Sequence, residues 1–134
     1  MDSRYIMNKR EEKVMEHLWT KGIPMTITEL EELMVDEKLG KASIFKAVQS
    51  LMKYGYIKIN GVELVGKSYA RRFEAAISKE EYAAIVLLEK GFSRSSLGEI
   101  AVAMIGSEKG SKKNKKENEK LIADLERVIA KLKE

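Results

Sequence analysis

The residues best suited to chemistry lie between Leu39 and Tyr56, where hydroxyl and cationic side chains recur at helical spacing. They are Ser43, Lys46, Ser50 and Lys53. No acidic residue interrupts this stretch, so one face of the predicted helix can approach a phosphate backbone without electrostatic repulsion. The pattern is typical of nucleic-acid contact, although an ordinary amphipathic helix with a solvated basic face would show it too.

The opposite face of the same stretch is apolar. Its residues follow the i, i+3, i+4, i+7 spacing of a buried helical stripe, and they are Ile44, Ala47, Val48 and Leu51. The helix is expected to begin after Gly40 and to end at Tyr54-Gly55. On its flank, Gln49 has the donor and acceptor that read adenine, and Phe45 either packs on a thymine methyl group or is buried against the preceding helix.

A β-hairpin is predicted to follow this helix. A strand over Tyr56–Ile59 leads to the turn dipeptide Asn60-Gly61, and a second strand over Ser68–Phe73 returns. The segment Val62–Lys67 between them is expected to form the tip of the hairpin.

The charge of the chain is unevenly distributed. From Glu11 to Glu37, eight acidic residues face two lysines, a net charge of −6, whereas from Lys41 to Arg72 seven basic residues face one acid, a net charge of +6. Adjacent segments of opposite sign indicate one surface that meets a polyanion and another that is kept away from it. Lys67, Arg71 and Arg72 would contact backbone phosphate from the hairpin, or else form a solvated edge. The full set of expected DNA contacts is Lys41, Ser43, Phe45, Lys46, Gln49, Ser50, Lys53, Lys67, Arg71 and Arg72.

Capping boxes predict where three of the helices begin. The segment before Asn8 is expected to be an extended arm, and Met25–Ile27 a short edge strand. The capping pairs are Asn8 with Glu11, Thr28 with Glu31, and Ser78 with Glu81.

The C-terminal half is predicted to be helical, with apolar surfaces that need the other C-terminal helices or a second copy of the chain to cover them. The run Tyr82–Leu88 is apolar all round, so more than one neighbour must cover it. An amphipathic helix over Leu97–Ile105, a polar linker over Gly106–Asn114 and a last helix over Lys115–Lys133 follow, the last with a 4-3-4 apolar seam. The expected interface residues are Tyr82, Ile85, Leu88, Leu97, Ile100, Met104, Leu121, Leu125, Val128 and Leu132.

Catalytic and metal chemistry have no candidate residues. His17 is the only histidine and no cysteine occurs, so a metal site, a disulfide and a cysteine nucleophile are not expected. Glu11, Glu12 and Glu16 have the spacing of a solvated helix surface. We therefore predict a protein that is not an enzyme and that uses no cofactor. With no signal core or membrane-spanning run, a cytoplasmic location is expected.

The order of helix, strand, helix, helix and hairpin is that of a winged helix-turn-helix domain. The predicted fold class is mainly α with a small β-hairpin, with a DNA-binding domain over residues 1–76 and a helical dimerisation domain over residues 77–134.

Several motifs resemble the penicillinase-repressor family of bacterial transcriptional repressors (BlaI/MecI/CopY type). The resemblance implies a homodimer that binds a palindromic operator and represses transcription. The motifs are Glu11-x-x-Val14-Met15-x-x-Leu18-Trp19, Ser43-Ile44, Leu51-x-x-x-Gly55-Tyr56-Ile57, Ile77-Ser78-x-Glu80-Glu81-Tyr82 and Phe92-x-x-x-Ser96-Leu97.

The chain departs from this family at its functional positions. Gly40-Lys41 stands where the family often has Ser/Thr-Pro, and Phe45 and Lys46 replace more polar residues, so no operator sequence is implied. Penicillinase-type members are cleaved at an Asn-Phe bond, and this chain has Ile100-Ala101 at about the matching place. The cysteine cluster of copper-responsive members is missing. The alternative function is a winged-helix module that docks a partner protein; such a surface should expose apolar anchors.

Overall fold

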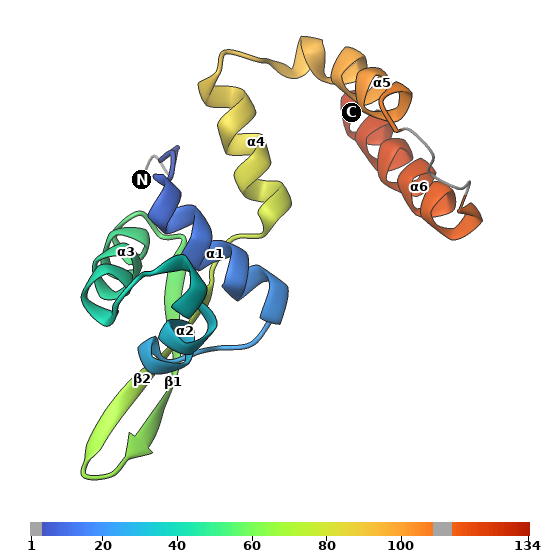
Figure 1. Cartoon of the computed structure of the whole chain (residues 1–134). Helices are drawn as coiled ribbons and strands as arrows, with labels where there is room; N and C mark the ends of the chain where they lie inside the picture. The colour runs from blue at the N-terminus through green and yellow to red at the C-terminus, as the bar shows by residue number, and fades with distance from the viewer. Residues whose placement is uncertain (1–3, 109–113) are drawn as a thin grey trace. The chain divides into compact units, whose positions relative to one another are not determined.

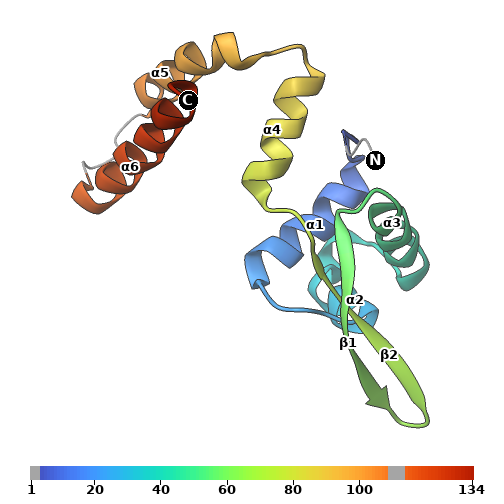
Figure 2. The ribbon, with the colours of Figure 1, turned by 180° about the vertical axis from the view of Figure 1, so that it is seen from behind.

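The computed structural model describes residues 4–108 and 114–134. Contacts between Cα atoms divide the chain into two compact units, Met1–Ser93 and Arg94–Glu134. The fold is mainly helical with one two-stranded antiparallel sheet, which confirms the predicted fold class. The first unit contains α1 (Lys9–Lys21), α2 (Ile27–Leu33), the short 3-10 helix η1 (Val35–Glu37), α3 (Lys41–Lys53), β1 (Ile57–Val65), β2 (Ser68–Ala75) and α4 (Lys79–Glu89) (Figures 1 and 2).

Two of the predicted capping boxes are confirmed. The Asn8 side chain accepts a hydrogen bond from the Glu11 N–H at 2.9 Å, and the Glu11 carboxylate accepts one from the Asn8 N–H at 2.9 Å. Ser78 and Glu81 form the same reciprocal pair at the start of α4. Both boxes satisfy backbone donors that a helix N-terminus otherwise leaves unpaired.

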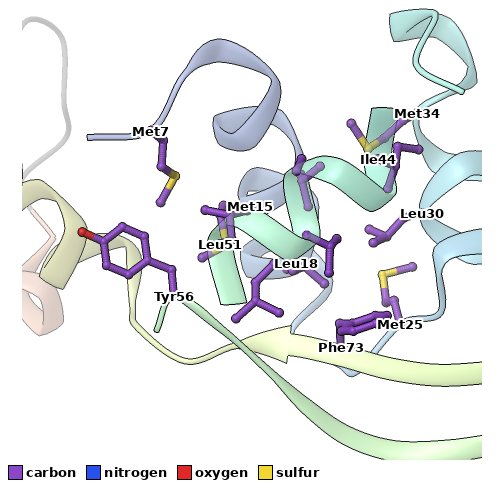
Figure 3. Close-up of a cluster of buried hydrophobic side chains, with 14 of the residues drawn as sticks. Met7, Met15, Leu18, Met25, Leu30, Met34, Ile44, Leu51, Tyr56 and Phe73 are labelled. Atoms are coloured by element: carbon purple, nitrogen blue, oxygen red, sulfur yellow. The ribbon is translucent and has the colours of Figure 1, made fainter. Parts of the chain in front are cut away.

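The predicted capping box at Thr28 is wrong, because α2 begins two residues earlier. Thr26 is the N-cap, and its partner is Glu29. The segment contains two overlapping Thr-x-x-Glu patterns, and only the first is flanked by apolar residues at the positions of a hydrophobic staple. These flanking residues are Met25 and Leu30, and both are buried in the core (Figure 3).

The predicted edge strand over Met25–Ile27 is reduced to one bridge. Met25 exchanges two backbone hydrogen bonds of 2.8 Å with Phe73 on β2, and both side chains are drawn in the core in Figure 3. Ile27 already belongs to α2. The bridge fixes the hairpin against the turn that connects α1 to α2.

The hairpin turns later than the sequence predicts. Asn60-Gly61 is not the turn but a bulge in β1, between the pairs Ile59–Phe73 and Val62–Arg71. Gly61 has a φ of 104°, which a side chain would disfavour. The strands continue to the Val65–Ser68 pair, so Gly66-Lys67 form the turn, and the hairpin projects from the helices in Figures 1 and 2. A bulge increases local twist and re-aims the distal part of a hairpin.

The hydrophobic core lies among α1, α2, α3 and the base of the hairpin (Figure 3). All four residues of the predicted α3 stripe are buried, with Ile44 and Leu51 fully so. Replacing Leu51 by Ala would cost about 2–5 kcal/mol of stability, the range for a fully buried leucine. The stripe therefore fixes which face of α3 points outward.

The second unit contains η2 (Arg94–Ser96), α5 (Leu97–Gly106) and α6 (Lys115–Leu132), close to the predicted helices. Part of the predicted linker, residues 109–113, lies outside the described residues. The unit boundary falls after α4, whereas the predicted domain boundary falls before it, because Tyr82 on α4 is buried in the first unit. The predicted assignment of DNA binding and dimerisation to the two parts stays a prediction.

Candidate nucleic-acid interface

The exposed face of α3 holds five of the seven residues predicted there. Lys41, Phe45, Lys46, Gln49 and Lys53 are exposed, and we call them the α3 outer face. Ser43 and Ser50 are half-buried at its margins. The sequence predicts that Phe45 is either exposed or buried against the preceding helix. It is 47% exposed, so its ring lies outside the core.

The lysines of this face have no ionic partner among the described residues. In the described part of the chain, none of Lys41, Lys46 and Lys53 forms a salt bridge. The Lys53 ammonium lies 5.6 Å from the centroid of the Tyr54 ring, a cation–π distance. The three charges are therefore available to an anion in solution.

The hairpin, which we call the wing, carries two further basic residues without a described ionic partner. Lys67 is at the turn, next to Gly66 with its φ of 62°, and Arg71 is exposed on β2. Lys58 on β1 instead pairs with Glu74 at 3.4 Å.

Arg72 differs from its predicted role as a phosphate contact. Its guanidinium donates to Glu29 on α2 at 2.9 Å, to Glu63 on β1 at 2.7 Å and to the Pro24 carbonyl at 3.1 Å. Three internal acceptors occupy the group, so Arg72 holds the wing against α2. No local pattern predicts this role, because the three partners lie nine to 48 residues away.

The wing also exposes an apolar surface that the sequence analysis did not single out. Val62, Leu64 and Tyr69 are 60%, 61% and 75% exposed. The strand register places them on one face together with Arg71, since residues opposite each other in a ladder share a face. Alternation along the two predicted strands would have shown this surface, had the turn been placed correctly.

The predicted extended arm before α1 is packed rather than free over residues 4–8. The Tyr5 ring stacks on Tyr54 with centroids 3.7 Å apart, and the Met7 side chain is buried. The Tyr5 hydroxyl donates to Glu11 at 2.6 Å. That hydrogen bond, and then burial, raise the pKa of Tyr5 above its ordinary value of 10.0.

The prediction that Glu11 lies on a solvated surface is wrong. Glu11 is only 2% exposed, and its carboxylate accepts hydrogen bonds from the Tyr5 hydroxyl and the Asn8 N–H.

His17, predicted to have no chemistry, lies with its Nε2 atom 2.9 Å from the Glu37 carboxylate. Within the described residues, no group of three metal-ligating side chains comes together.

The expected interface residues fall into two groups. Tyr82 is 9% exposed and packs inside the first unit, where burial raises the pKa of its hydroxyl. Ile85 is half-buried against the same core, and Leu88 is exposed. No residue of α5 or α6 is buried. The large apolar residues of α6 are 37–59% exposed, and they are Leu121, Ile122, Leu125, Val128, Ile129 and Leu132.

Comparisons with known proteins add little to this geometry. No family model and no curated protein matches the chain. Among solved structures it is similar to Staphylococcus aureus MarR in complex with salicylate and kanamycin, with a TM-score of 0.43 and 13% identity, over 94% of this chain and 75% of that chain. A likeness at this level supports no conclusion about function. In residues 4–108 and 114–134, none of the helices has the length and apolar character needed to cross a membrane.

Proposed function

We propose that this chain is a sequence-specific DNA-binding regulator of transcription that acts as a homodimer. The observation that carries the proposal is the α3 outer face, on which Lys41, Lys46 and Lys53 are exposed and form no salt bridge with a described residue. The opposite stripe is buried, so this face alone of α3 is open to a ligand. A helix of this kind, presented before a wing, suits insertion into the major groove.

Base recognition is assigned to the middle of the outer face. Gln49 can donate and accept at an adenine edge, and the exposed Phe45 ring can pack on a thymine methyl group. Lys46 can donate to guanine or phosphate. Lys67 and Arg71 on the wing would bind backbone phosphate, which positions the protein without reading sequence.

The proposed dimer interface is assigned to the helices of the second unit. The apolar side chains of α6 recur as three per heptad, wider than a two-stranded seam, and all are partly exposed. A monomer would leave these side chains in water. Two copies would present two α3 helices about 34–36 Å apart, which suits a palindromic site. Repression, rather than activation, rests on the resemblance to the penicillinase-repressor family.

In vitro selection from random duplex DNA, followed by a salt titration on the selected site, tests the proposal. With roughly 6–10 phosphate contacts in a dimer, the plot of log affinity against log salt should have a slope of about −5 to −9. Lys46→Ala with Gln49→Ala should relax the selected sequence, whereas Arg71→Ala should weaken all sequences alike. Failure to enrich any duplex, or binding insensitive to salt, would contradict DNA recognition.

A second candidate is docking of a partner protein, favoured by the exposed apolar face of the wing. Val62, Leu64 and Tyr69 are the kind of anchors that a protein interface uses. If the chain docks a protein rather than DNA, neither the wild type nor a variant with Val62→Ser and Leu64→Ser should bind duplexes from the selection. A loss of DNA affinity in this variant would count against the second candidate.

A further inference from the structure

The N-terminal arm, residues 4–8, reaches the C-terminal end of α3, where the Tyr5 ring packs on Tyr54. The Tyr5 and Tyr54 rings are stacked, with centroids 3.7 Å apart and planes inclined by 2°. Tyr54 is the residue that caps α3, where the helix ends before Gly55 at a φ of 80°. The contact joins residues 49 positions apart in sequence, so it is made only in the folded unit.

Tyr5 is held in this position by hydrogen bonds on both sides of its ring. Its backbone N–H donates to the Tyr56 hydroxyl at 2.9 Å, and that hydroxyl donates to the Tyr5 carbonyl at 2.7 Å. The Tyr5 hydroxyl donates to the buried Glu11 carboxylate at 2.6 Å. Two residues on, the Met7 N–H donates to the Tyr82 hydroxyl at 2.8 Å. The arm is thus fixed at both ends of the ring that stacks on α3.

Tyr54 in turn holds a charge of the proposed DNA interface. The Lys53 ammonium lies 5.6 Å from the Tyr54 ring centroid. A lysine side chain otherwise samples many rotamers, and that freedom is lost when the ammonium binds a phosphate. A ring fixed by stacking restricts the lysine before DNA arrives, so less freedom remains to be lost on binding.

We infer that Tyr5 is a positioning residue of the DNA interface: its ring fixes Tyr54, and Tyr54 fixes the Lys53 ammonium at the end of the recognition helix. The inference rests on the proposed DNA-binding function and extends it to a residue outside α3 and the wing. Tyr5 itself contacts no DNA in this arrangement; it acts through Tyr54.

A double-mutant cycle on the selected DNA site separates this role from a general loss of stability. Tyr5→Ala should weaken binding about 3–10-fold, in the range of an ordered side chain or cation–π contact, and Tyr5→Phe, which keeps the ring, should stay within about twofold. Tyr5→Ala should add less than about twofold to Lys53→Ala, because the lysine it positions is already gone. The matched control is Lys46→Ala: in the double variant, the fold-losses of DNA affinity from Tyr5→Ala and Lys46→Ala should multiply. If the fold-losses from Tyr5→Ala and Lys53→Ala also multiply in full, the inference is overturned.

Hydrogen–deuterium exchange gives a readout that needs no DNA. In the full chain, the Tyr54 N–H donates to the Ser50 carbonyl and the Gly55 N–H donates to the Met52 carbonyl. Tyr5→Ala should speed exchange of these two amides at least several-fold and leave the α1 amides Met15 and Leu18 protected. Tyr5→Phe keeps the stacked ring but loses the hydrogen bond to Glu11, so it should speed their exchange less than Tyr5→Ala does. Unchanged exchange in Tyr5→Ala would overturn the positioning role. If wild type binds no DNA yet the two amides loosen, the positioning of α3 stands and the proposed function alone fails.

Discussion

Arg72 on β2 donates from Nη1 to the carboxylate of Glu29 on α2 at a distance of 2.9 Å. The hydrogen bond joins the wing to the helix that precedes α3, across 43 residues of sequence. Its neighbour Arg71 points to the other face of the strand and is exposed. Two adjacent arginines of the same basic stretch therefore have different surroundings, and they form a matched pair for experiment.

Arg72→Ala should lower the free energy of unfolding by about 1 kcal/mol, because it removes hydrogen bonds to two partly exposed carboxylates and a carbonyl. Arg71→Ala should change stability by less than about 0.5 kcal/mol, as an exposed substitution does. Urea unfolding of the two variants measures the difference. Equal losses would contradict the structural role of Arg72.

The stability of the fold should depend on Glu29 at acid pH. The hydrogen bond from the Thr26 N–H, and then the charge of Arg72, lower the pKa of Glu29 from its ordinary value of 4.5. The ionised form is thus favoured in the folded state, so its contribution is present above 4.5 and is lost as the pH falls through the lower folded pKa. Glu29→Gln should flatten stability against pH in that window. Urea unfolding at a series of pH values tests this, with the exposed Glu32→Gln as control; a slope unchanged by Glu29→Gln would be the contrary result.

Glu11→Ala should destabilise the protein by about 2 kcal/mol, because it removes half of a capping box and leaves the Tyr5 hydroxyl without its acceptor. The neighbouring Glu12 is exposed on the same helix, and Glu12→Ala should cost less than about 0.5 kcal/mol. Thermal and urea unfolding compare the two. A Glu11→Ala variant as stable as wild type would show that the arm does not depend on this carboxylate.

Leu125→Glu should convert the proposed dimer to a monomer, since it places a charge in the α6 apolar seam. Ala123→Glu introduces the same charge about 160° away around the helix and should leave the dimer intact, as the 100° step per residue predicts. Light scattering after size exclusion measures the mass of each variant. A wild-type monomer at micromolar concentration, or equal effects of both substitutions, would contradict an interface on this seam.

Phe45→Ala should leave stability within about 0.5 kcal/mol, because the ring is 47% exposed and outside the core. If the ring packs on a thymine methyl group, selection with this variant should lose thymine at one position of each half-site while the flanking bases remain. Retention of that base with loss of another would mean that Phe45 reads a different part of the groove.

The parts of the fold that depend on neighbouring residues could be predicted from the sequence. The two capping boxes, Asn8 with Glu11 and Ser78 with Glu81, span three positions, and the α3 stripe spans seven. All the residues that form each of these structures therefore lie within a short stretch of sequence. The same reasoning failed at Thr28, where two overlapping patterns competed. The apolar pair Met25 and Leu30 decides between them, and that pair was in the sequence.

What could not be predicted depends on distant partners. Asn60-Gly61 has turn chemistry, but pairing with β2 makes it a bulge and moves the turn to Gly66-Lys67. Arg72 belongs to the basic stretch, yet its guanidinium is engaged by acceptors on other elements and is less available to the proposed DNA ligand. The residues around Tyr5 do not predict where its ring packs, because its contacts with Tyr54 and Tyr56 arise only from tertiary folding.

The hydrogen bond between the Met7 N–H and the Tyr82 hydroxyl also sets an order of events during protein synthesis. The arm leaves the ribosome before the rest of the first unit. Its partners Tyr54 and Tyr56 emerge only after α3, and Tyr82 emerges after nearly the whole first unit has been made. Contacts of such long sequence separation form late and slow folding. The nascent chain should therefore build α1 to α3 before the arm is attached, and completion of the domain should wait until α4 has left the exit tunnel.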